Sequence, residues 1–514
     1  MTLRSLTHIG LLVALACSAG AQGIRGDQVL RVTVKLSLEE DAGQNFGSLF
    51  EANTADGKHA VGAGFLGLYN TRYRADRYTL QFFVRPTAGE RPLTIERLPR
   101  PNETAGAYLF ELDGKLYVTG ADDPVRQWDP AANAWATDEG EPRPGRMRLA
   151  DGLLTFDDNY AAFNGEQLLG APERGNFFRY YYAHGHLCFY HTDYAGTSGY
   201  RDYVSDDEGF TKLYACPWKP GDGPINLADA TVMVLPFVGE YPFAWGQLGA
   251  EVVTCSNIGG IYVFDGVAWK TIHDGKLGES YQVYSMLNTY DRMLLGQYPT
   301  GMLFEYDGES VTLLDGQPPR IEGVSGSSRE AQTTAIYGGD IYVGVWPWGE
   351  LWRYCPDSGE WHSCGRMFTH PEPHNNTTHP YQTDCEEHDL VHNEWGQRVT
   401  SLVPLGESMM LSTSAKWPHD WNPEWGFIEG DGWKEYGAVL RLHAPGNLSV
   451  PIKPTESETE LTFIIQGDTM QIEQDGELLG SASLGDLIPD DLTDIKWGQG
   501  VFGPFGGESL EGDG

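Results

Sequence analysis

The sequence has few basic residues. Its 514 residues include 35 Lys and Arg against 72 Asp and Glu, so the formal net charge is −37. Binding to nucleic acid or insertion at an anionic membrane surface depends on Lys and Arg, and both are therefore disfavoured. Polyanionic substrates are disfavoured as well, unless a local cationic patch or a bound metal intervenes. The simplest interpretation of the charge is solubility outside the cell.

Several sequence patterns are missing. The chain has few long runs of Ala, Leu, Glu and Lys, which helices would favour, and no second long apolar run that could cross a membrane. It also has no G-x-S-x-G, P-loop, Rossmann glycine set or H-E-x-x-H. These absences disfavour nucleophile-elbow hydrolases and nucleotide enzymes.

Residues 1–21 have the pattern of a secretory signal. Arg4 gives a basic start, residues 9–16 are apolar, and residues 19–21 form a cleavage site of the A-x-A type. Cys17 is compatible with a lipoprotein, but Ala14 stands where a lipobox usually has Leu. We therefore expect cleavage after Ala21 and a secreted or periplasmic protein, with a monomer favoured.

Cysteine is scarce. The seven cysteines become six after cleavage, and an exported chain permits disulfides. Cys355 and Cys364 flank one turn and are the expected pair. The sequence does not pair the other four, which are Cys188, Cys216, Cys255 and Cys385.

Glycine is abundant, at 64 residues, and aromatic residues are plentiful, which favours strands and turns. The stretch GGDIYVGVWPWGELWRYCPDSGEW at 338–361 joins two hairpins through a Trp-Pro-Trp corner. The same arrangement recurs, and D-G and G-G dipeptides mark its hairpin turns. The second hairpins of the seven copies lie at 124–135, 159–168, 199–211, 260–269, 301–311, 349–361 and 437–448.

Two hairpins per copy make a four-stranded antiparallel meander, and roughly 50 residues per copy is the size of a propeller blade. The sequence therefore predicts an all-β fold with a seven-bladed β-propeller at 101–451. The flanks, 22–100 and 452–514, contain further strand-like runs. They are expected to form a small sandwich together, or to contribute a strand that closes the ring.

In this architecture the chain resembles the kelch and sialidase-like propeller superfamily. The segment SDDEGFT at 205–211 matches the Asp-box S-x-D-x-G-x-T-W, except that Lys212 replaces the Trp. The resemblance implies that this segment is a turn between the outer two strands of the third blade. It is a marker of the fold and would lie away from the active face.

The four strands of a blade run a, b, c, d from the centre outward, and the face with the b–c corners usually holds the site. His184 and His186 fall in an a–b turn on the other face, although they look like a metal pair. Residues expected at the b–c corners or the ends of b strands are Asp122, Asp123, Asp157, Asp158, His191, Asp193, Tyr194, Tyr298, Trp346 and Trp348.

The corner of the seventh blade is unusually long, at 412–436. Long loops within compact domains are usually functional or disordered, and one so rich in Trp is not expected to be disordered. Aromatic faces stack on sugar rings while Asp accepts hydroxyl hydrogen bonds, so this loop is a candidate sugar-binding surface. The alternative is that the tryptophans only fold the loop against the rim. The residues concerned are Trp417, His419, Asp420, Trp421, Trp425 and Trp433.

The crossing into the seventh blade, at 369–398, concentrates histidines. If the segment from Asp384 onward is helical, Asp384, His388 and His392 share one face at a spacing suited to Zn²⁺ or Mn²⁺, with Cys385 as an alternative ligand. The histidines could instead act as general acid or base, or belong to an ordinary polar loop. The five histidines are His370, His374, His379, His388 and His392.

Four arginines stand near the starts of predicted a strands and hence near the central mouth: Arg146, Arg179, Arg329 and Arg398. Sialidases hold a substrate carboxylate with three arginines at this place, so the resemblance implies that one uronate or sialate could be admitted here. No spacing proves such a triad, and ordinary ion pairing with the many acids is the simpler explanation.

We expect a carbohydrate-active protein with its site at the central mouth, cleaving a glycan by hydrolysis or by a lyase reaction. A hydrolase needs two carboxylates across the bond, and the candidates are Asp122, Asp157, Asp193 and Asp420. A lyase needs a base and a cation or metal for the uronate, for which His191, His388, His392 and Arg398 are candidates. The alternative is a non-catalytic extracellular module that binds glycan or protein through the same aromatic face.

Overall fold

The computed structural model describes residues 29–37, 47–70, 79–120, 124–137, 146–149, 152–194, 200–279, 281–314, 316–453, 458–506 and 509–514. The expected signal peptide and Cys17 lie outside these residues, and so do Asp122 and Asp123. The described residues form strands β1 to β41, the helix α1 (Gln382–Glu387) and three short 3-10 helices, η1 (Leu227–Asp229), η2 (Pro423–Trp425) and η3 (Gly432–Glu435). None of the helices described is long and apolar enough to span a membrane.

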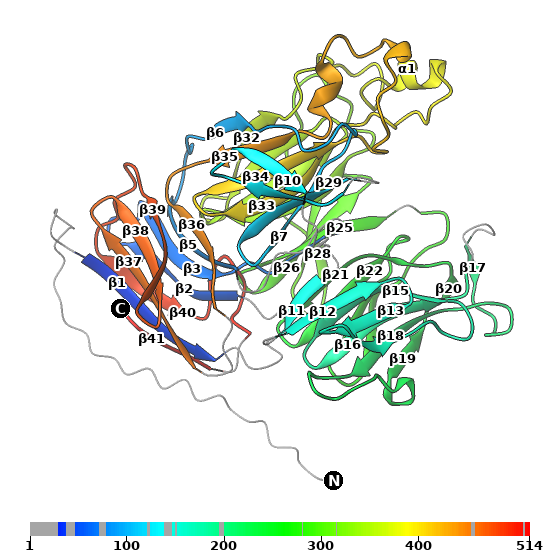
Figure 1. Cartoon of the computed structure of the whole chain (residues 1–514), viewed down its shortest axis with the longest axis horizontal. Coiled ribbons are helices and arrows are strands. Elements are labelled where there is room, and N and C mark those ends of the chain that lie inside the picture. The colour runs from blue at the N-terminus through cyan, green and yellow to red at the C-terminus, as the bar shows by residue number, and fades with distance from the viewer. Residues whose placement is uncertain are drawn as a thin grey trace, which may run out of the picture.

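Seven antiparallel sheets are built on four strands each (Figure 1). The first sheet contains β7 (Tyr108–Leu112), β8 (Lys115–Thr119), β9 (Arg126–Asp129) and β10 (Ala134–Thr137). The second contains β11 (Arg146–Leu149), β12 (Gly152–Asp157), β13 (Tyr160–Phe163) and β14 (Glu166–Leu169). The third contains β15 (Asn176–Ala183), β16 (His186–Thr192), β18 (Thr211–Pro217) and β19 (Thr231–Val234). A short pair, β17 (Arg201–Asp202) and β20 (Phe237–Val238), lies beside the third.

The fourth sheet contains β21 (Pro242–Leu248), β22 (Glu251–Ser256), β23 (Ile261–Phe264) and β24 (Trp269–His273). The fifth contains β25 (Gln282–Thr289), β26 (Arg292–Tyr298), β27 (Leu303–Tyr306) and β28 (Val311–Leu313). The sixth contains β29 (Glu330–Tyr337), β30 (Asp340–Trp346), β31 (Glu350–Cys355) and β32 (Glu360–Arg366). The strand β4 (Leu68–Asn70) adds to β25. The seventh sheet contains β33 (Arg398–Leu405), β34 (Ser408–Ser414), β35 (Val439–His443) and β6 (Thr94–Arg97).

The first strands of neighbouring sheets pack against one another. β15 contacts β21, β21 contacts β25, β25 contacts β29, β29 contacts β33, and β33 contacts β7. This is the radial packing of propeller blades, so the all-β propeller fold predicted from the sequence is confirmed. That the blades number seven and close into one ring stays a prediction.

The hairpin turns explain why these segments pair as they do. Asp113 and Gly114 have φ of 54° and 74°, and Gly338 and Gly339 have φ of 56° and 78°. Two successive positive φ values match the right-handed twist of the flanking strands, which is why D-G and G-G are strong hairpin signals. His184 and Gly185 form the equivalent turn between β15 and β16, where the sequence placed it.

The seventh sheet corrects one prediction. The sequence assigned 437–448 to a c–d hairpin, but only β35 stays in this sheet, and its outer neighbour is β6 from the N-terminal flank. The strand β36 (Asn447–Pro451) instead pairs with β5 (Thr79–Pro86). The flank therefore does contribute a strand to the propeller, in exchange for one that leaves it.

The Asp-box segment is also placed differently. Residues 205–211 precede β18, in the connection between β16 and β18, so they lie at a b–c corner and not between the outer two strands. The outer strand is β19, beyond a connection that the sequence pattern did not mark as a turn. Within the segment Asp206 pairs with Lys212, which stands where the family has Trp.

The two flanks form a sandwich of two five-stranded sheets, at the left in Figure 1. One contains β39 (Glu477–Ser483), β38 (Thr469–Gln474), β37 (Thr459–Gln466), β1 (Val29–Ser37) and β41 (Ser509–Asp513), and the other β36, β5, β3 (His59–Phe65), β2 (Gly47–Thr54) and β40 (Leu492–Trp497). Their facing side chains share one core, in which the Phe463 ring lies 5.3 Å from Phe50 and 5.2 Å from Phe82.

The predicted Cys355–Cys364 disulfide is wrong. Cys355 pairs across the ladder with Glu360, so a β-turn and not the thiols closes this hairpin. All six described cysteines are free, and burial raises the pKa of Cys364 to about 12.

Buried ion pairs attach the sandwich to the propeller. Arg85 of β5 is fully buried, pairs with Asp357 in the β31–β32 turn, and has Glu51 at 3.6 Å. Asp340, at the β29–β30 turn, is fully buried and lies 3.4 Å from Arg91 and 3.1 Å from Arg353. Since a–b and c–d turns share one face, this face carries the sandwich and the opposite one holds the mouth.

We predict that replacing Asp340 with Asn lowers the free energy of unfolding by about 3–5 kcal/mol, because two buried guanidinium groups lose their counter-charge. Urea denaturation monitored by circular dichroism measures the change. The matched control is Glu477→Gln, which breaks an exposed pair with Lys453 and should cost at most about 1 kcal/mol. Equal effects of the two substitutions would contradict the docking role.

Candidate binding site at the central mouth

A pocket of about 330 Å³ opens where the innermost strands begin, on the face away from the sandwich. Its walls come from the starts of β15, β21, β25 and β33 and from the residues that follow β34. It is lined by Arg179, Tyr241, Pro242, Phe243, Tyr284, Arg398, Lys416 and Trp417. The pocket thus combines three cations with four aromatic side chains.

Three of the lining residues sit at β-bulges in successive inner strands. The β15 ladder shifts register across Arg179, the β21 ladder at Phe243 and the β25 ladder at Tyr284. A bulge leaves the extra residue unpaired and re-aims its side chain, and bulges are frequent next to functional sites. The same irregularity in three neighbouring strands therefore directs one cation and two rings to the mouth.

Arg179 is the most distinctive residue of the pocket. It is exposed, and its φ of 57° lies in the left-handed region that residues other than glycine, Asn and Asp seldom adopt. Its side chain makes no hydrogen bond or ion pair with the described residues. Backbone strain is usually retained only where the structure enforces it, often at ligand sites. An exposed guanidinium held in this way is available to an anion.

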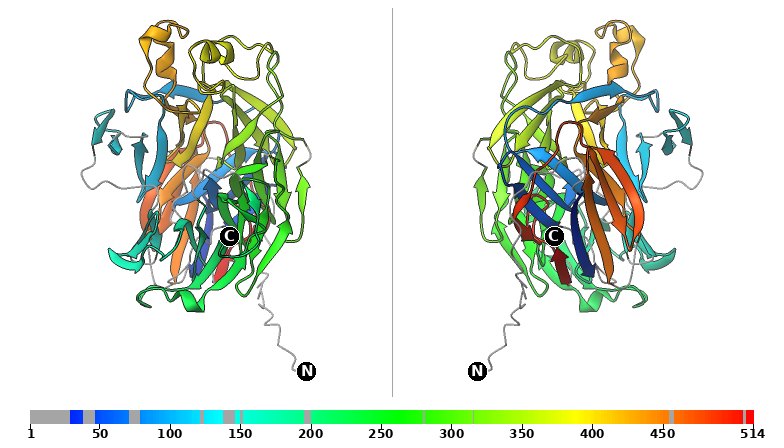
Figure 2. Two further views of the ribbon diagram at one scale, coloured as in Figure 1. Left: turned by 90° about the vertical axis from the view of Figure 1, so that its right-hand side faces the viewer. Right: turned by 90° about the vertical axis from the view of Figure 1, so that its left-hand side faces the viewer.

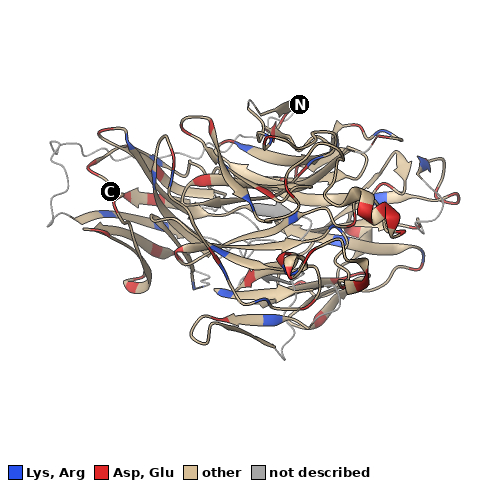
Figure 3. Cartoon of the chain, turned by 90° about the horizontal axis from the view of Figure 1, so that it is seen from above, with Lys and Arg blue, Asp and Glu red and all other residues tan. Residues whose placement is uncertain are grey.

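A buried carboxylate organises the other two cations. Glu330, the first residue of β29, is fully buried and accepts a hydrogen bond from Arg398 at 3.0 Å. The Lys416 ammonium lies 3.9 Å from its other oxygen and 4.7 Å from the Trp346 ring centroid. Burial lowers the pKa of Lys416, Glu330 raises it, and Arg398 lowers it further. Glu330 therefore meets two of the three cations of the pocket, and the lining itself has no acidic residue, so the mouth is net positive in a chain of net charge −37. Elsewhere acidic residues are widely spread (Figure 3).

The aromatic residues form a continuous wall. The Phe243 ring lies 4.9 Å from Tyr284 in an edge-on arrangement and 5.6 Å from Tyr241. Trp417 is 49% exposed, so much of its indole is open to a ligand. Such rings can stack on the C–H faces of a sugar while the cations hold a negative group.

The tryptophans of the Trp-Pro-Trp corner are not a sugar-binding surface. Trp346 and Trp348 are 1% and 0% exposed, because the 369–398 segment covers them. His379 packs on Trp346 with ring centroids 4.8 Å apart, and His374 packs on Trp348 at 5.1 Å. The Trp346 ring instead packs against the Lys416 ammonium. The half-buried Tyr298 ring lies beside it, with its centroid 6.4 Å from that of Trp346.

The long corner at 412–436 divides into two parts. Trp421, Trp425 and Phe427 are half-buried and pack edge-on around Trp395, whose ring centroid lies 5.1, 5.9 and 6.2 Å from theirs. These rings fold the loop, which is the alternative that the sequence analysis left open. His419 and Asp420 are exposed and do not line the pocket. Of the residues that the sequence singled out in this corner, Trp417 lines the mouth pocket, next to Lys416.

The expected metal site depended on a helix that is shorter than its pattern required. The helix α1 ends at Glu387, and Asp389 has a φ of 58°, so Asp384, His388 and His392 do not share a helical face. No group of three His, Cys, Asp or Glu is placed to hold a metal ion in the described part of the chain. A zinc or manganese site thus has no ligand set there.

The histidines of the 369–398 segment have packing partners instead. His370 bonds the Gly432 carbonyl at 2.8 Å and lies 3.1 Å from Glu435, and the His388 ring lies 5.8 Å from Phe427. These contacts join the segment to the long corner, and the two project side by side from one end of the molecule (Figure 2). His392 lies against His379, with ring centroids 5.3 Å apart.

The remaining candidates also have structural partners. His191 is wedged between Phe177 and Phe210 and bonds the Arg174 carbonyl at 2.7 Å, and burial lowers its pKa. Asp193 pairs with Arg174 and accepts from the Phe210 amide at 2.7 Å. Neither lines the mouth pocket.

Of the four arginines expected near the mouth, Arg179 and Arg398 line the pocket. Arg329 instead pairs with Glu350 at 3.2 Å and donates to the Pro318 and Pro319 carbonyls. The side chain of Arg146 lies outside the described residues. The sequence analysis missed Lys416, Glu330, Tyr241, Phe243 and Tyr284, although each stands beside or at the start of a strand that it had placed correctly.

No protein-family model matches the chain, and no curated protein matches its sequence significantly. Solved structures that are similar include the WD40 repeats of RRP9, with 10% identity and a TM-score of 0.34 over 69% of this chain and 99% of that one. BamB from Moraxella catarrhalis has 10% identity and a TM-score of 0.30 over 81% and 98%. An oligogalacturonate lyase in complex with manganese has 9% identity and a TM-score of 0.28 over 82% and 99%. Likenesses at these scores carry no argument about function.

We predict that His379 makes folding pH-dependent. Burial lowers its pKa from 6.5 to about 4. Because the unfolded chain binds this proton more tightly, the stability that neutral His379 provides is complete above about pH 6.5 and is lost as the pH falls through about 4. His379→Phe keeps a ring against Trp346 and should flatten the dependence of unfolding free energy on pH across this range. His419→Phe, at an exposed site, is the control and should leave the slope unchanged; equal slopes in both variants and the wild type would refute the assignment.

Proposed function

We propose that the protein is an exported carbohydrate-binding propeller whose central mouth receives an acidic sugar, such as a uronate or sialate residue of a glycan. The observation that carries this proposal is Arg179, an exposed guanidinium with no hydrogen bond or ion pair among the described residues, held by a bulge over a pocket of aromatic rings and further cations. The pocket of about 330 Å³ has room for about one sugar ring with parts of its neighbours.

The charges of the mouth account for the choice of an acidic sugar. The charge of Arg398 is partly neutralised by its hydrogen bond to Glu330, whereas the Lys416 ammonium lies 3.9 Å from that carboxylate and is only weakly paired. Arg179 and Lys416 therefore provide the positive charge that the ligand meets. A carboxylate between them forms charge-assisted hydrogen bonds, which are stronger than neutral ones. The net charge of −37 on the chain would repel a polyanion, whereas one carboxylate at the end of a glycan meets mainly the cations of the mouth.

The aromatic residues account for the choice of a sugar. Trp417 is 49% exposed and offers a ring face on which pyranose C–H groups stack, and the 8% exposed Tyr284 adds apolar surface below it. The half-buried Tyr241 supplies a hydroxyl that can exchange hydrogen bonds with sugar hydroxyls. A phosphate or a simple carboxylate would need the cations but would leave most of the aromatic wall unused. The combination favours a carboxylated sugar over a small inorganic anion.

Binding is better supported than cleavage. A glycoside hydrolase needs two carboxyl groups placed across the bond, and none of the residues that line the pocket is Asp or Glu. Glu330 lies behind the pocket and is committed to Arg398 and Lys416. The histidines that sequence analysis offered as bases do not line the mouth either. The geometry therefore favours the binding module over the hydrolase or lyase.

We predict that the mature chain binds oligosaccharides that end in one uronate or sialate residue and are otherwise neutral, and that it binds their fully neutral counterparts much more weakly. Arg179→Gln should weaken binding roughly tenfold or more, because a charge-assisted hydrogen bond is lost. Trp417→Ala should weaken it as well, through the loss of stacking area. Isothermal titration calorimetry at low and high salt measures both effects, and salt should weaken the acidic ligands selectively.

The control is Arg31→Gln, which removes an exposed arginine of the sandwich and should not change affinity. Equal affinity for acidic and neutral glycans, or unchanged binding by Arg179→Gln, would refute the proposal. New reducing ends or unsaturated uronates in the same mixtures would show that the mouth cleaves its ligand, contrary to the binding module.

A further inference from the structure

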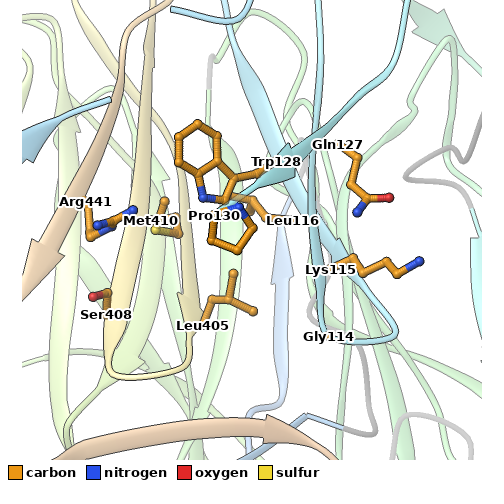
Figure 4. A pocket seen from close by; sticks show the side chains of 10 residues that line it. All are labelled: Gly114, Lys115, Leu116, Gln127, Trp128, Pro130, Leu405, Ser408, Met410 and Arg441. Atoms are coloured by element: carbon orange, nitrogen blue, oxygen red, sulfur yellow. The ribbon is translucent and has the colours of Figure 1, made fainter. Parts of the chain in front are cut away.

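A second pocket, of about 350 Å³, lies between the β7–β10 sheet and the β33–β35 sheet, on the face that carries the sandwich. It is formed beside two a–b turns, at Gly114 and at Ser408, and so opens on the opposite side of the molecule from the mouth. Its lining residues are Gly114, Lys115, Leu116, Gln127, Trp128, Pro130, Leu405, Ser408, Met410 and Arg441 (Figure 4).

The wall of this pocket is apolar at its centre. Trp128, Leu116 and Met410 are 5%, 1% and 3% exposed, and Figure 4 shows the Trp128 indole between Met410 on one side and Leu116 on the other. Pro130 and Leu405 complete the same surface. The two sheets therefore do not fully cover each other here, and a flat apolar space remains between them.

One polar group in this wall has no partner among the described residues. The Trp128 indole N–H makes no hydrogen bond with the described residues, although the residue is 5% exposed. The indole N–H groups of Trp135, Trp218 and Trp269, in contrast, each donate to a backbone carbonyl. Figure 4 shows the Trp128 nitrogen on the edge of the ring that faces Met410 and Pro130. This N–H is not among the described side-chain donors that are sealed from solvent without a partner, so it stays accessible to an acceptor that a ligand in the pocket supplies.

The charge at the pocket has one sign. The charged lining residues are Lys115 and Arg441, and none is acidic. Figure 4 shows the Lys115 side chain extending away from the indole, while the Arg441 guanidinium lies on the side of Met410. Arg441 lies 3.2 Å from Glu96 of β6, whose side chain is 59% exposed. Such an exposed pair contributes little and can be exchanged for a ligand's carboxylate.

We propose that this pocket is a second ligand site, which takes a small molecule with a flat apolar body and one carboxylate. The body packs between Trp128 and Met410, and the carboxylate accepts the indole N–H of Trp128 and pairs with Arg441. The site is independent of the proposed glycan site, because the two pockets share no residue and lie on opposite faces. A bound ligand also contacts the sheet that β6 completes, so binding should stabilise this strand exchange.

The test uses 2-naphthoate as the probe and 2-naphthamide as its neutral match, with the full mature chain. Saturation-transfer NMR detects contact, and calorimetric titration gives the affinity. We expect 2-naphthoate to bind about tenfold more tightly than 2-naphthamide and to raise the melting temperature. Trp128→Phe keeps the ring but removes the N–H, and Arg441→Gln removes the charge at a partly exposed site; each should weaken 2-naphthoate about tenfold.

Two matched controls separate this site from others. Trp135→Phe removes an indole N–H that is already bonded to the Pro99 carbonyl, and Arg179→Gln disables the mouth, where an aromatic acid could also bind. Neither should change the affinity for 2-naphthoate. Absence of binding, equal binding of the amide, or loss of binding in Arg179→Gln but not in Trp128→Phe and Arg441→Gln would overturn the proposal. Failure of the glycan proposal would leave these outcomes unchanged.

Discussion

The sheet of β29 to β32 has a fully buried carboxylate at each end, and much of the structure depends on how these two charges are met. Asp340, at the turn next to the sandwich, is met by Arg91 and Arg353, and Glu330, at the mouth, is met by Arg398 and Lys416. A buried charge without a partner costs several kcal/mol. Arg353 belongs to the same sheet, but Arg91, Arg398 and Lys416 come from outside it, so each carboxylate is fully met only when those segments are in place.

The two ends serve different purposes. At the sandwich end the guanidinium groups of Arg85, Arg91 and Arg353 are matched by the carboxylates of Glu51, Asp340 and Asp357. Glycine makes the close approach possible, because a Cβ on Gly339 would lie 2.5 Å from the Phe83 ring. At the mouth the balance is incomplete, since Glu330 cannot neutralise Arg398, Lys416 and the nearby Arg179 together. Pairing of a buried carboxylate with cations thus gives a rigid joint on one face and a positively charged pocket on the other.

Much of the fold could be predicted from the sequence, because D-G and G-G turns and alternating strands are local signals. The exchange of β6 for β36 could not, because it joins residues more than 300 positions apart, as in the pairing of Ile95 with Leu442. The predicted Cys355–Cys364 disulfide was wrong because the spacing of two cysteines around a turn does not fix which residues face each other. The Asp-box was misplaced because a short motif does not show which of two connections it occupies.

The site was predicted in part. Face assignment from the order of strands correctly brought Arg179, Arg398 and Trp417 towards the mouth. It also selected Trp346 and Trp348, whose burial depends on a covering segment that local sequence does not describe. Phe243 and Tyr284 reach the pocket through β-bulges, and a bulge arises from pairing with a distant strand. The histidine hypothesis rested on helical spacing, and α1 ends at Glu387, before the second and third expected ligands.

The most direct test of the central claim is a crystal structure of the mature protein soaked with a trisaccharide that carries one terminal uronate residue. The account predicts a sugar ring against Trp417 and Tyr284, with its carboxylate within hydrogen-bond distance of the Arg179 guanidinium. A mouth that holds only water at saturating ligand, or a sugar bound elsewhere on the chain, would contradict it.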